Sequence, residues 1–400
     1  MHTKTKNVLF TLIAVLMFFA SMNFMSKFFY FTFAAAFILF LCKTSVKFDY
    51  TSIIYLVAGF IMAMYHMSYG ILAALRCFAG AICYWVGYNV ASGTTLDENI
   101  LLEDRDFKKD GLEFAYIVLV AIASGSFIHY ILNFFINIGT DLGRNTIDLW
   151  TGEIMAATGQ AALSCIMAGY AMSKILSPRR KFSRLLGILI VLGILAYNLI
   201  LAGRTLIVMM CIVFTIGLVY IIIKEKNASK KMRTLMFIGL AFMVVALIVL
   251  SNLGGIWDYI QNSNLYQRFF SVGGIDVDET NRWEAKLYYL EHMFEYPFGG
   301  MHLQKAYGGY AHDLILDAYG EFGFVVAIML IVIVIIGIKD ILEFIKKDAI
   351  PTAYKCSFLC VHVAILIEFF VEPILFGMPW LFACYALVNG MVAKLNREYS

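Results

Sequence analysis

The chain has little charge and little proline. Charged residues make up 15% of its 400 residues and five residues are proline, whereas a soluble domain carries about 25% charged residues. Hydrophobic residues reach 61%, and the mean hydropathy is +0.79. One water-facing globule cannot bury that much apolar surface. The composition therefore excludes a soluble enzyme, a disordered chain and a disulfide-stapled secreted domain, and it predicts an all-α polytopic membrane protein.

Several chemical signatures are also missing. The sequence contains no glycine-rich phosphate loop, no nucleophile elbow, no H-E-x-x-H pair and no cysteine-rich metal pattern. Cys356 and Cys360 lie four residues apart near His362, but no fourth ligand is close in the sequence. The clusters of basic residues fall where cytoplasmic loops are expected, so they need no nucleic-acid partner to account for them. The sequence therefore predicts no metal, no cofactor and no nucleic-acid partner.

Long apolar runs, by contrast, fill most of the chain. A helix needs roughly 20 apolar residues to cross a bilayer. The first run follows Lys4 and Lys6 and could imitate a signal peptide, but no small-residue cleavage site precedes a soluble domain, so we interpret it as a span. We predict a single integral membrane domain over residues 1–400. It is expected to be a helical bundle of about 12 transmembrane helices, centred near residues 15, 35, 60, 80, 124, 164, 193, 214, 243, 326, 361 and 384.

Lysine and arginine predict the orientation, because they accumulate in cytoplasmic loops. With a cytoplasmic N-terminus, 23 of the 31 basic residues face inward, seven face outward, and Arg76 lies within a span. An even number of helices then places both termini in the cytoplasm. One long extracytoplasmic loop covers residues 252–311. We expect function there, since loops held by a rigid scaffold often carry binding residues.

A short amphipathic helix is expected inside this loop. Asn281 can cap a helix with Glu284 three residues on, and Pro297-Phe-Gly-Gly300 is expected to end it. Its apolar residues recur on one helical face: Trp283, Leu287, Leu290 and Phe294. The helix would lie on the outer leaflet, or it would be a lid that packs on the bundle with no chemical role.

Three carboxylates open the tenth predicted span. Asp313, Asp317 and Glu321 are four residues apart, so they are expected on one face of a helix. The uncharged run 322–338 already nearly spans the hydrocarbon, which places the acids at the outer rim or in a wet cavity, where ionisable residues are by default functional. They suit proton handling or sugar-hydroxyl binding; a solvated helix entrance is the alternative. Two further acids end the eleventh span and would help to line a cavity: Glu368 and Glu372.

Four arginines are expected near the outer surface. Arg204 lies where the chain turns at the outer end of the eighth span, Arg76 lies a few residues into the fourth, and Arg268 and Arg282 lie in the long loop. Arginine holds phosphate in a bidentate fork that lysine cannot match, so the arginines favour a lipid diphosphate as ligand. For Arg76 a structural pair with a buried acid or backbone carbonyls stays open, and for Arg268 a solvated loop position.

The motif His312-x-x-x-Leu316-x-x-x-x-Glu321-x-Gly323 resembles the signature of the O-antigen polymerase (Wzy-type) and O-antigen ligase superfamily of polytopic membrane glycosyltransferases. Gly203-Arg204-Thr205 is similar to that family's helix start, and Arg282-Trp283 followed by Pro297-Phe-Gly-Gly300 is similar to its loop. The motifs fall within residues 185–338, some 40% of the chain. Asp313 stands where the family more usually has Asn, and Phe298-Gly-Gly-Met301 departs from its G-x-G.

The resemblance implies a metal-independent glycosyltransferase in the bacterial inner membrane, with its active site outside the cytoplasm and polyprenyl-diphosphate-linked oligosaccharides as donor and acceptor. Charge builds on the diphosphate as the glycosidic bond breaks, so fixed cations stabilise the transition state. We assign that catalytic role to Arg204 and Arg282. His312 is the candidate general base or acceptor-hydroxyl orienter. The expected substrate-binding residues are Arg76, Arg268, Asp313, Asp317, Glu321 and, by stacking on sugar, Trp283.

Three functions stay open on these grounds. The first is a polysaccharide polymerase for O-antigen, capsule or exopolysaccharide, with the lipid bilayer, a chain-length regulator and a flippase as further expected partners. The second is a ligase that hands the glycan to a lipid-core or protein acceptor. The third is a flippase or secondary transporter, although transporters usually show repeats and midplane charges, whereas here no repeat is visible and the charges cluster at the rim.

Overall fold

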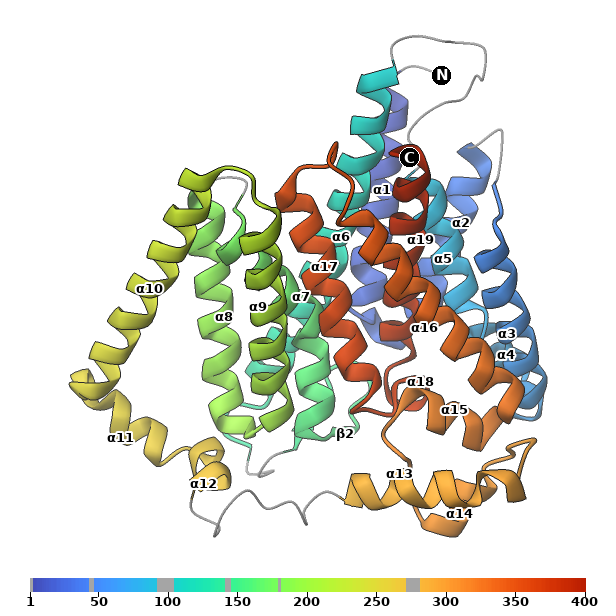
Figure 1. The fold of residues 1–400 in the computed structure, drawn as a ribbon. Coiled ribbons are helices and arrows are strands. Elements are labelled where there is room, and N and C mark those ends of the chain that lie inside the picture. The colour runs from blue at the N-terminus through green and yellow to red at the C-terminus, as the bar shows by residue number, and fades with distance from the viewer. Residues whose placement is uncertain (1–2, 43–46, 92–103, 141–144, 179–180, 271–280) are drawn as a thin grey trace. The chain divides into compact units, whose positions relative to one another are not determined.

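The computed structural model describes residues 3–42, 47–91, 104–140, 145–178, 181–270 and 281–400 (Figure 1). It is 82% helical, which confirms the predicted all-α class. The chain forms two compact units. The first unit comprises Met1–His129, Asn281–Ile350 and Ile365–Ser400, and the second comprises Tyr130–Thr280 and Pro351–Ala364.

Eight helices among the described residues are long and apolar enough to cross a membrane, so the chain is a membrane protein. They are Tyr50–Tyr69, Ile71–Val90, Gly111–Ile136, Phe182–Leu201, Arg204–Lys224, Ala228–Leu250, Phe324–Phe344 and Thr352–Phe369. Two shorter apolar helices cover Phe10–Ser21 and Phe28–Leu41.

The predicted count of twelve spans is therefore not confirmed, although a helix lies at each of the twelve predicted centres. Two of the four other helices are the shorter apolar ones, and the remaining two differ for a physical reason. Helices α7 (Ala157–Leu176) and α19 (Pro379–Glu398) are each 20 residues long but are buried along most of their length. A helix that is surrounded by protein needs no lipid-facing surface, so its sequence can be less apolar than that of a helix exposed to lipid.

The first unit is a bundle built around α19. Its elements are α1 (Thr3–Ser21), η1 (Phe24–Ser26), α2 (Phe28–Cys42), α3 (Tyr50–His66), η2 (Met67–Tyr69), α4 (Ile71–Arg76), α5 (Ala79–Val90), most of α6 (Asp104–Ile136), α13 (Asn281–His292), η4 (Met293–Glu295), α14 (His302–Tyr307), α15 (Leu314–Phe322), α16 (Phe324–Phe344), the end of α17 (Thr352–Phe369), α18 (Ile374–Gly377) and α19.

Helices α5 and α19 approach each other at backbone distance because glycines face each other there. A Cβ on Gly87 would lie 2.1 Å from the carbonyl oxygen of Leu387, and one on Gly390 would lie 2.1 Å from that of Tyr84. Small residues of this kind let membrane helices pack closely. At one end of this unit, α13 and α14 lie across the end of the long helices, below α15 (Figure 1).

The second unit packs α7 against α8 (Lys181–Leu201) and α9 (Arg204–Lys224). Its other elements are the end of α6, most of α17, α10 (Ala228–Leu250), η3 (Leu253–Gly255), α11 (Ile256–Gln261), α12 (Asn264–Phe270), β1 (Thr146–Ile147) and β2 (Ile154–Met155). The strands pair antiparallel, with Thr146 opposite Met155. The side chain of Asn137 fixes this ribbon, since it accepts from the Ile147 N–H at 2.7 Å and donates to the Ile147 carbonyl at 2.9 Å.

Candidate active site

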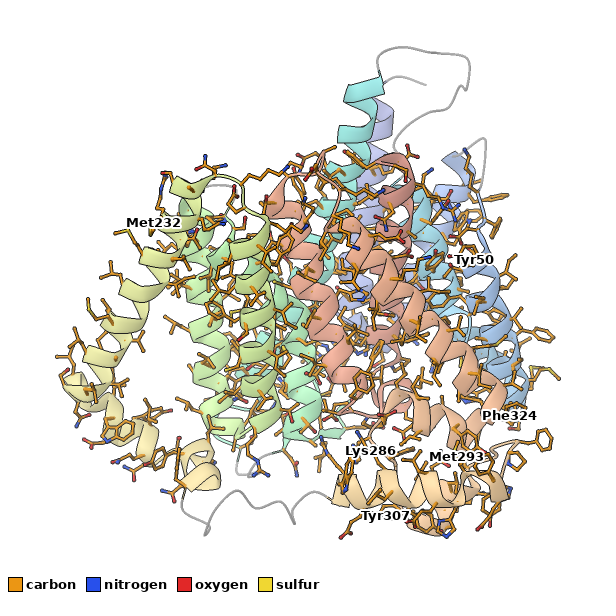
Figure 2. All side chains as sticks on the ribbon, viewed as in Figure 1. Tyr50, Met232, Lys286, Met293, Tyr307 and Phe324 are labelled. Carbon is orange, nitrogen blue, oxygen red and sulfur yellow. The ribbon has the colours of Figure 1, made fainter. Side chains whose placement is uncertain are left out.

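Helix α13 carries two cations one turn apart, Arg282 and Lys286. Figure 2 labels Lys286 on this helix. Ala285 and Tyr289, on the side that faces the rest of the first unit, are fully buried. The predicted amphipathic helix is thus present, and it packs on the bundle. The helix begins with Asn281 rather than after it, and it ends at His292, before the expected stop at Pro297. The predicted apolar stripe faces away from the unit and is exposed: Trp283, Leu287, Leu290 and Phe294.

The two cations bind the turn that directly follows α17, which ends at Phe369. Arg282 Nη1 donates to the carbonyl oxygen of Val371 at 2.7 Å, and Nη2 lies 3.1 Å from Oε1 of Glu372. Lys286 Nζ donates to the carbonyl oxygen of Phe370 at 2.6 Å. The last carbonyl groups of a helix lack partners within it and carry the negative end of its dipole. This local field explains why both cations of α13 are held at this point.

Asp313 joins this cluster from the start of α15. Its Oδ1 caps the helix by accepting the N–H groups of Ile315 and Leu316 at 3.0 and 3.2 Å, a role that aspartate performs well before a first helical turn. Its Oδ2 lies 3.6 Å from Lys286 Nζ. One carboxylate therefore both starts the helix and pairs with a cation of α13.

Asp317 holds the backbone on both sides of His312. It is fully buried, and it accepts the N–H of Ala311 at 2.7 Å and that of Asp313 at 3.1 Å. Between them, His312 adopts a left-handed φ of 55°, which costs energy for any residue other than glycine. The Nδ1 atom of His312 is buried and has no hydrogen-bond partner among the described residues. The two hydrogen bonds to Asp317 thus hold His312 in a strained backbone conformation, and its Nδ1 atom can still form a hydrogen bond.

Burial in this cluster shifts the pKa values of His312 and Asp317 in opposite directions. Burial, together with the positive charges of Arg282 and Lys286, lowers the pKa of His312 to about 4. Burial raises the pKa of Asp317 to about 7, although the N–H groups of Asp313 and Ala311 favour its ionised form. At neutral pH the imidazole of His312 is therefore uncharged and can accept a hydrogen bond or a proton.

A further carboxyl group lies beside Arg282. Glu368, four residues before Glu372, is fully buried, and neither of its carboxyl oxygens has a hydrogen-bond partner among the described residues. The charges of Glu372 and Arg282 both act on it. Lys286, in contrast, was not expected in the site. The signal that could have found it is its position four residues after Arg282, which places both cations on one side of a helix.

Glu321 belongs to a different cluster, at the other end of α15. Its Oε1 lies 2.8 Å from Nε2 of His66 on α3. The expectation of one shared face for three carboxylates is thus only partly met, because Asp313 precedes the helix as its cap and Glu321 has a partner of its own. All three are buried, with exposed fractions of 8%, 0% and 5% for Asp313, Asp317 and Glu321. The alternative of a solvated helix entrance is therefore wrong.

The glycine-containing motif residues contact one another. The N–H of Gly300 donates to the Glu321 carbonyl at 2.8 Å, and the N–H of Phe324 donates to the Pro297 carbonyl at 3.0 Å. Gly323, at the break between α15 and α16, has a φ of 80°, and a Cβ there would lie 2.7 Å from the Pro297 oxygen. The segments Pro297–Gly300 and Glu321–Gly323 are therefore held together by backbone hydrogen bonds; we call this contact the structural lock. The close backbone approach explains why glycine occurs in these segments, without any chemical role.

The remaining predicted residues lie elsewhere. Arg204 opens α9 in the second unit, after a turn in which Asn198 Nδ2 donates to the Gly203 carbonyl at 3.0 Å. Arg76 ends α4 with an exposed side chain that forms no ion pair with another described residue. The side chain of Arg268, on α12, lies outside the described part of the chain.

The structure thus brings together Arg282, His312, Asp313 and Asp317 from the predicted set, and it adds Lys286. Two cations beside a neutral imidazole can hold an anionic leaving group and accept a proton. No protein-family model and no curated protein sequence matches the chain. The function is therefore inferred from this cluster and from the membrane-spanning fold.

Proposed function

We propose that the protein is a polysaccharide polymerase. It would transfer glycan from a polyprenyl diphosphate to the acceptor sugar of another lipid-linked repeat unit, at the extracytoplasmic face of a bacterial inner membrane. The observation that carries the proposal is the grouping of Arg282, Lys286 and His312 at one end of a membrane-embedded unit. The resemblance of the motif skeleton to O-antigen polymerases and ligases supports the same class. A flippase and a chain-length regulator would be its partners.

The reaction that this site would perform is a displacement at the anomeric carbon. The acceptor hydroxyl oxygen forms a bond to that carbon, and the bond from the carbon to the diphosphate oxygen breaks. The electron pair of the broken bond leaves with the diphosphate, whose growing charge Arg282 and Lys286 would stabilise. Cations aimed at a developing charge lower the barrier more than they strengthen substrate binding. The two side chains supply the positive charge that a divalent ion supplies in other transferases.

His312 would receive the proton of the acceptor hydroxyl. Its imidazole is neutral near pH 7 because its pKa is about 4, and its Nδ1 has no partner in the described structure. A base with this pKa is weak, so its first role is to orient the hydroxyl, and proton transfer follows as the new bond forms. Asp317 acts as a positioning residue, because it holds the backbone on both sides of the histidine.

A product ladder tests this proposal. Purified protein in lipid vesicles is supplied with polyprenyl-diphosphate-linked repeat units, and the glycans are separated on a gel. We expect a ladder for the wild type and for Lys305→Ala, an exposed lysine of α14 in the same unit, and its loss in Arg282→Ala. Transfer that begins only after a separate lipid or protein acceptor is added would establish a ligase. Unfolding curves of each variant separate lost chemistry from lost folding.

Transport is the second candidate, and one observation favours it. Glu368 is a buried carboxyl group without a hydrogen-bond partner in the described structure, and it lies in an apolar spanning helix; such groups mark ion and proton pathways in many transporters. Cells that carry Arg282→Ala distinguish the two functions. A stalled transporter leaves lipid-linked units on the cytoplasmic leaflet, whereas a stalled polymerase accumulates them on the outer leaflet.

A further inference from the structure

The two cations of the site are already occupied by carboxylates of the chain itself. Arg282 Nη2 is 3.1 Å from Glu372 Oε1, and Lys286 Nζ is 3.6 Å from Asp313 Oδ2. Arg282 Nη1 is bonded to the Val371 carbonyl, so both terminal nitrogens of the guanidinium group are in use. Glu372 and Asp313 are 3% and 8% exposed. An anionic ligand that takes over the N–H group now bonded to Glu372 must therefore displace this internal anion.

Glu368 is the group that could bind the carboxylate of Glu372 after its displacement from Arg282. It lies one helical turn before Glu372, is fully buried, and neither of its oxygens is hydrogen-bonded within the described structure. A buried polar group without a partner is costly and rare. When Glu368 carries a proton, it can donate that proton to a carboxylate that has left Arg282. Two adjacent carboxyl groups that share one proton form a stable arrangement.

We propose that Glu372 is an internal stand-in for a diphosphate group. The ligand displaces Glu372 from Arg282, and Glu372 then accepts a hydrogen bond from the protonated carboxyl of Glu368. No covalent bond changes in this exchange, and the proton stays within the carboxyl pair. The choice of diphosphate as ligand rests on the proposed function, whereas the exchange itself rests on the contacts of Arg282, Glu372 and Glu368.

The exchange predicts that Glu372→Gln raises the affinity for diphosphate, which a purely structural ion pair does not predict. Glu372→Gln removes the competing charge but keeps a carbonyl oxygen that Arg282 can bind, so affinity for diphosphate should rise about tenfold, the size of one charge-assisted contact. If the pair served structure alone, the same substitution would leave the affinity for diphosphate unchanged or lower it. Glu368→Ala removes the new partner of Glu372 and should lower affinity, while Glu368→Gln should restore it, since an amide can donate to the carboxylate.

Calorimetry on the full chain in nanodiscs measures these affinities. The probes are inorganic diphosphate and a polyprenyl diphosphate, with the uncharged polyprenol as a control for binding of the lipid tail. Glu284→Gln is the matched control variant, because Glu284 is an exposed acid on α13 and its loss changes the net charge equally. Tighter binding of both diphosphates in Glu372→Gln supports a site that reads the phosphate groups alone, and tighter binding of the lipid diphosphate alone supports a headgroup site.

Unchanged or weaker binding of both probes in Glu372→Gln overturns the proposal, and so does an equal gain in Glu284→Gln. These results are independent of polymer formation. If Glu372→Gln binds diphosphate more tightly but no ladder forms in vesicles, the exchange stands and the polymerase function fails. If a ladder forms and Glu372→Gln binds diphosphate no better than the wild type, the function stands and the exchange fails.

Discussion

Among the described residues of the first unit, two arginine–carboxylate pairs differ in how the carboxylate oxygens are hydrogen-bonded. Arg397 Nη2 lies 3.3 Å from Oδ2 of Asp49. Oδ1 of Asp49 accepts the N–H of Ser52 at 2.9 Å and caps α3, and Oδ2 also accepts the hydroxyl of Tyr84 at 2.9 Å. Both carboxylate oxygens of Asp49 are thus fully used by neighbouring groups. The Asp49–Arg397 pair thus connects α3, α5 and α19 and has a structural role; we call it the structural joint.

The pair of Arg282 and Glu372 has a similar length but different surroundings. The carboxyl group of Glu368 beside it lacks hydrogen bonds, and the nearby His312 has a buried nitrogen without a partner within the described residues and a left-handed backbone. Strain and unsatisfied polar groups persist where they serve binding or chemistry. The comparison teaches that an ion pair by itself indicates no function, whereas incomplete hydrogen bonding around it does.

The largest expected effect is a difference in the rate of glycan transfer between variants of the two arginines. Arg282→Ala should lower the rate of glycan transfer by about 10²–10³-fold, the usual cost of removing one donor that stabilises a developing charge. Arg397→Ala should leave transfer per folded molecule unchanged, because its partners are structural. Initial rates in vesicles, normalised to folded protein, check this difference. Equal losses in both variants would show that the distinction between the pairs is wrong.

The second prediction concerns the stability of the structural joint. Asp49→Ala removes a helix cap, which costs about 1 kcal/mol, and leaves the buried hydroxyl of Tyr84 without its acceptor, which costs about 1–3 kcal/mol. Denaturant unfolding in detergent should show the sum of these losses. Glu372→Gln should lower stability less, since the amide oxygen still accepts from Arg282. A stability loss in Glu372→Gln that equals that of Asp49→Ala would contradict the comparison.

The third prediction tests whether the motif glycines are structural. Gly323→Ala should destabilise the unit by about 1–3 kcal/mol, the cost of a strained backbone conformation, since its φ is 80° and its Cβ would meet the Pro297 oxygen. Gly377→Ala is the matched control, because a Cβ at this position would have no neighbouring atom within 4 Å. Transfer per folded molecule should stay near the wild-type rate in both variants. A selective loss of rate in Gly323→Ala would assign the lock a chemical role.

The fold was predictable wherever apolarity alone decides the structure. Apolar runs predicted helices at the correct centres, but they could not tell which helices face lipid, because burial of α7 and α19 depends on their neighbours. The site was predictable where residues are close in sequence, as for His312, Asp313 and Asp317. The contacts of Lys286 and the orphaned carboxyl of Glu368 depend on how α13 docks on the end of α17, and no local pattern encodes this docking.

The fourth prediction uses the opposed pKa shifts of Asp317 and His312. A pKa of about 7 for Asp317 means that the folded state holds this proton more tightly than the unfolded state, so its stabilising contribution is lost as pH rises toward 7. A pKa of about 4 for His312 means that its contribution is lost as pH falls from 6.5 toward 4. Between pH 4 and 6.5 the two contributions oppose each other.

Substitutions should expose each contribution separately. Relative to the wild type, Asp317→Asn should become more stable as pH rises through this window, and His312→Gln should become less stable. Unfolding free energies of the two variants, each subtracted from that of the wild type at the same pH, cancel the other titrating groups. Parallel profiles for the wild type and both variants would contradict the assigned protonation states.

The smallest expected effect concerns Trp283, the neighbour of Arg282 on α13. It was predicted to stack on sugar, but 66% of its surface is exposed, and it belongs to the apolar stripe that faces away from the first unit. An exposed substitution of this kind usually changes stability by no more than about 0.5 kcal/mol. Trp283→Ala should therefore leave diphosphate affinity and chain stability nearly unchanged, as calorimetry and unfolding can measure. A large loss of affinity for the lipid-linked glycan, with inorganic diphosphate unaffected, would restore its role in sugar binding and show that this face of α13 also serves the substrate.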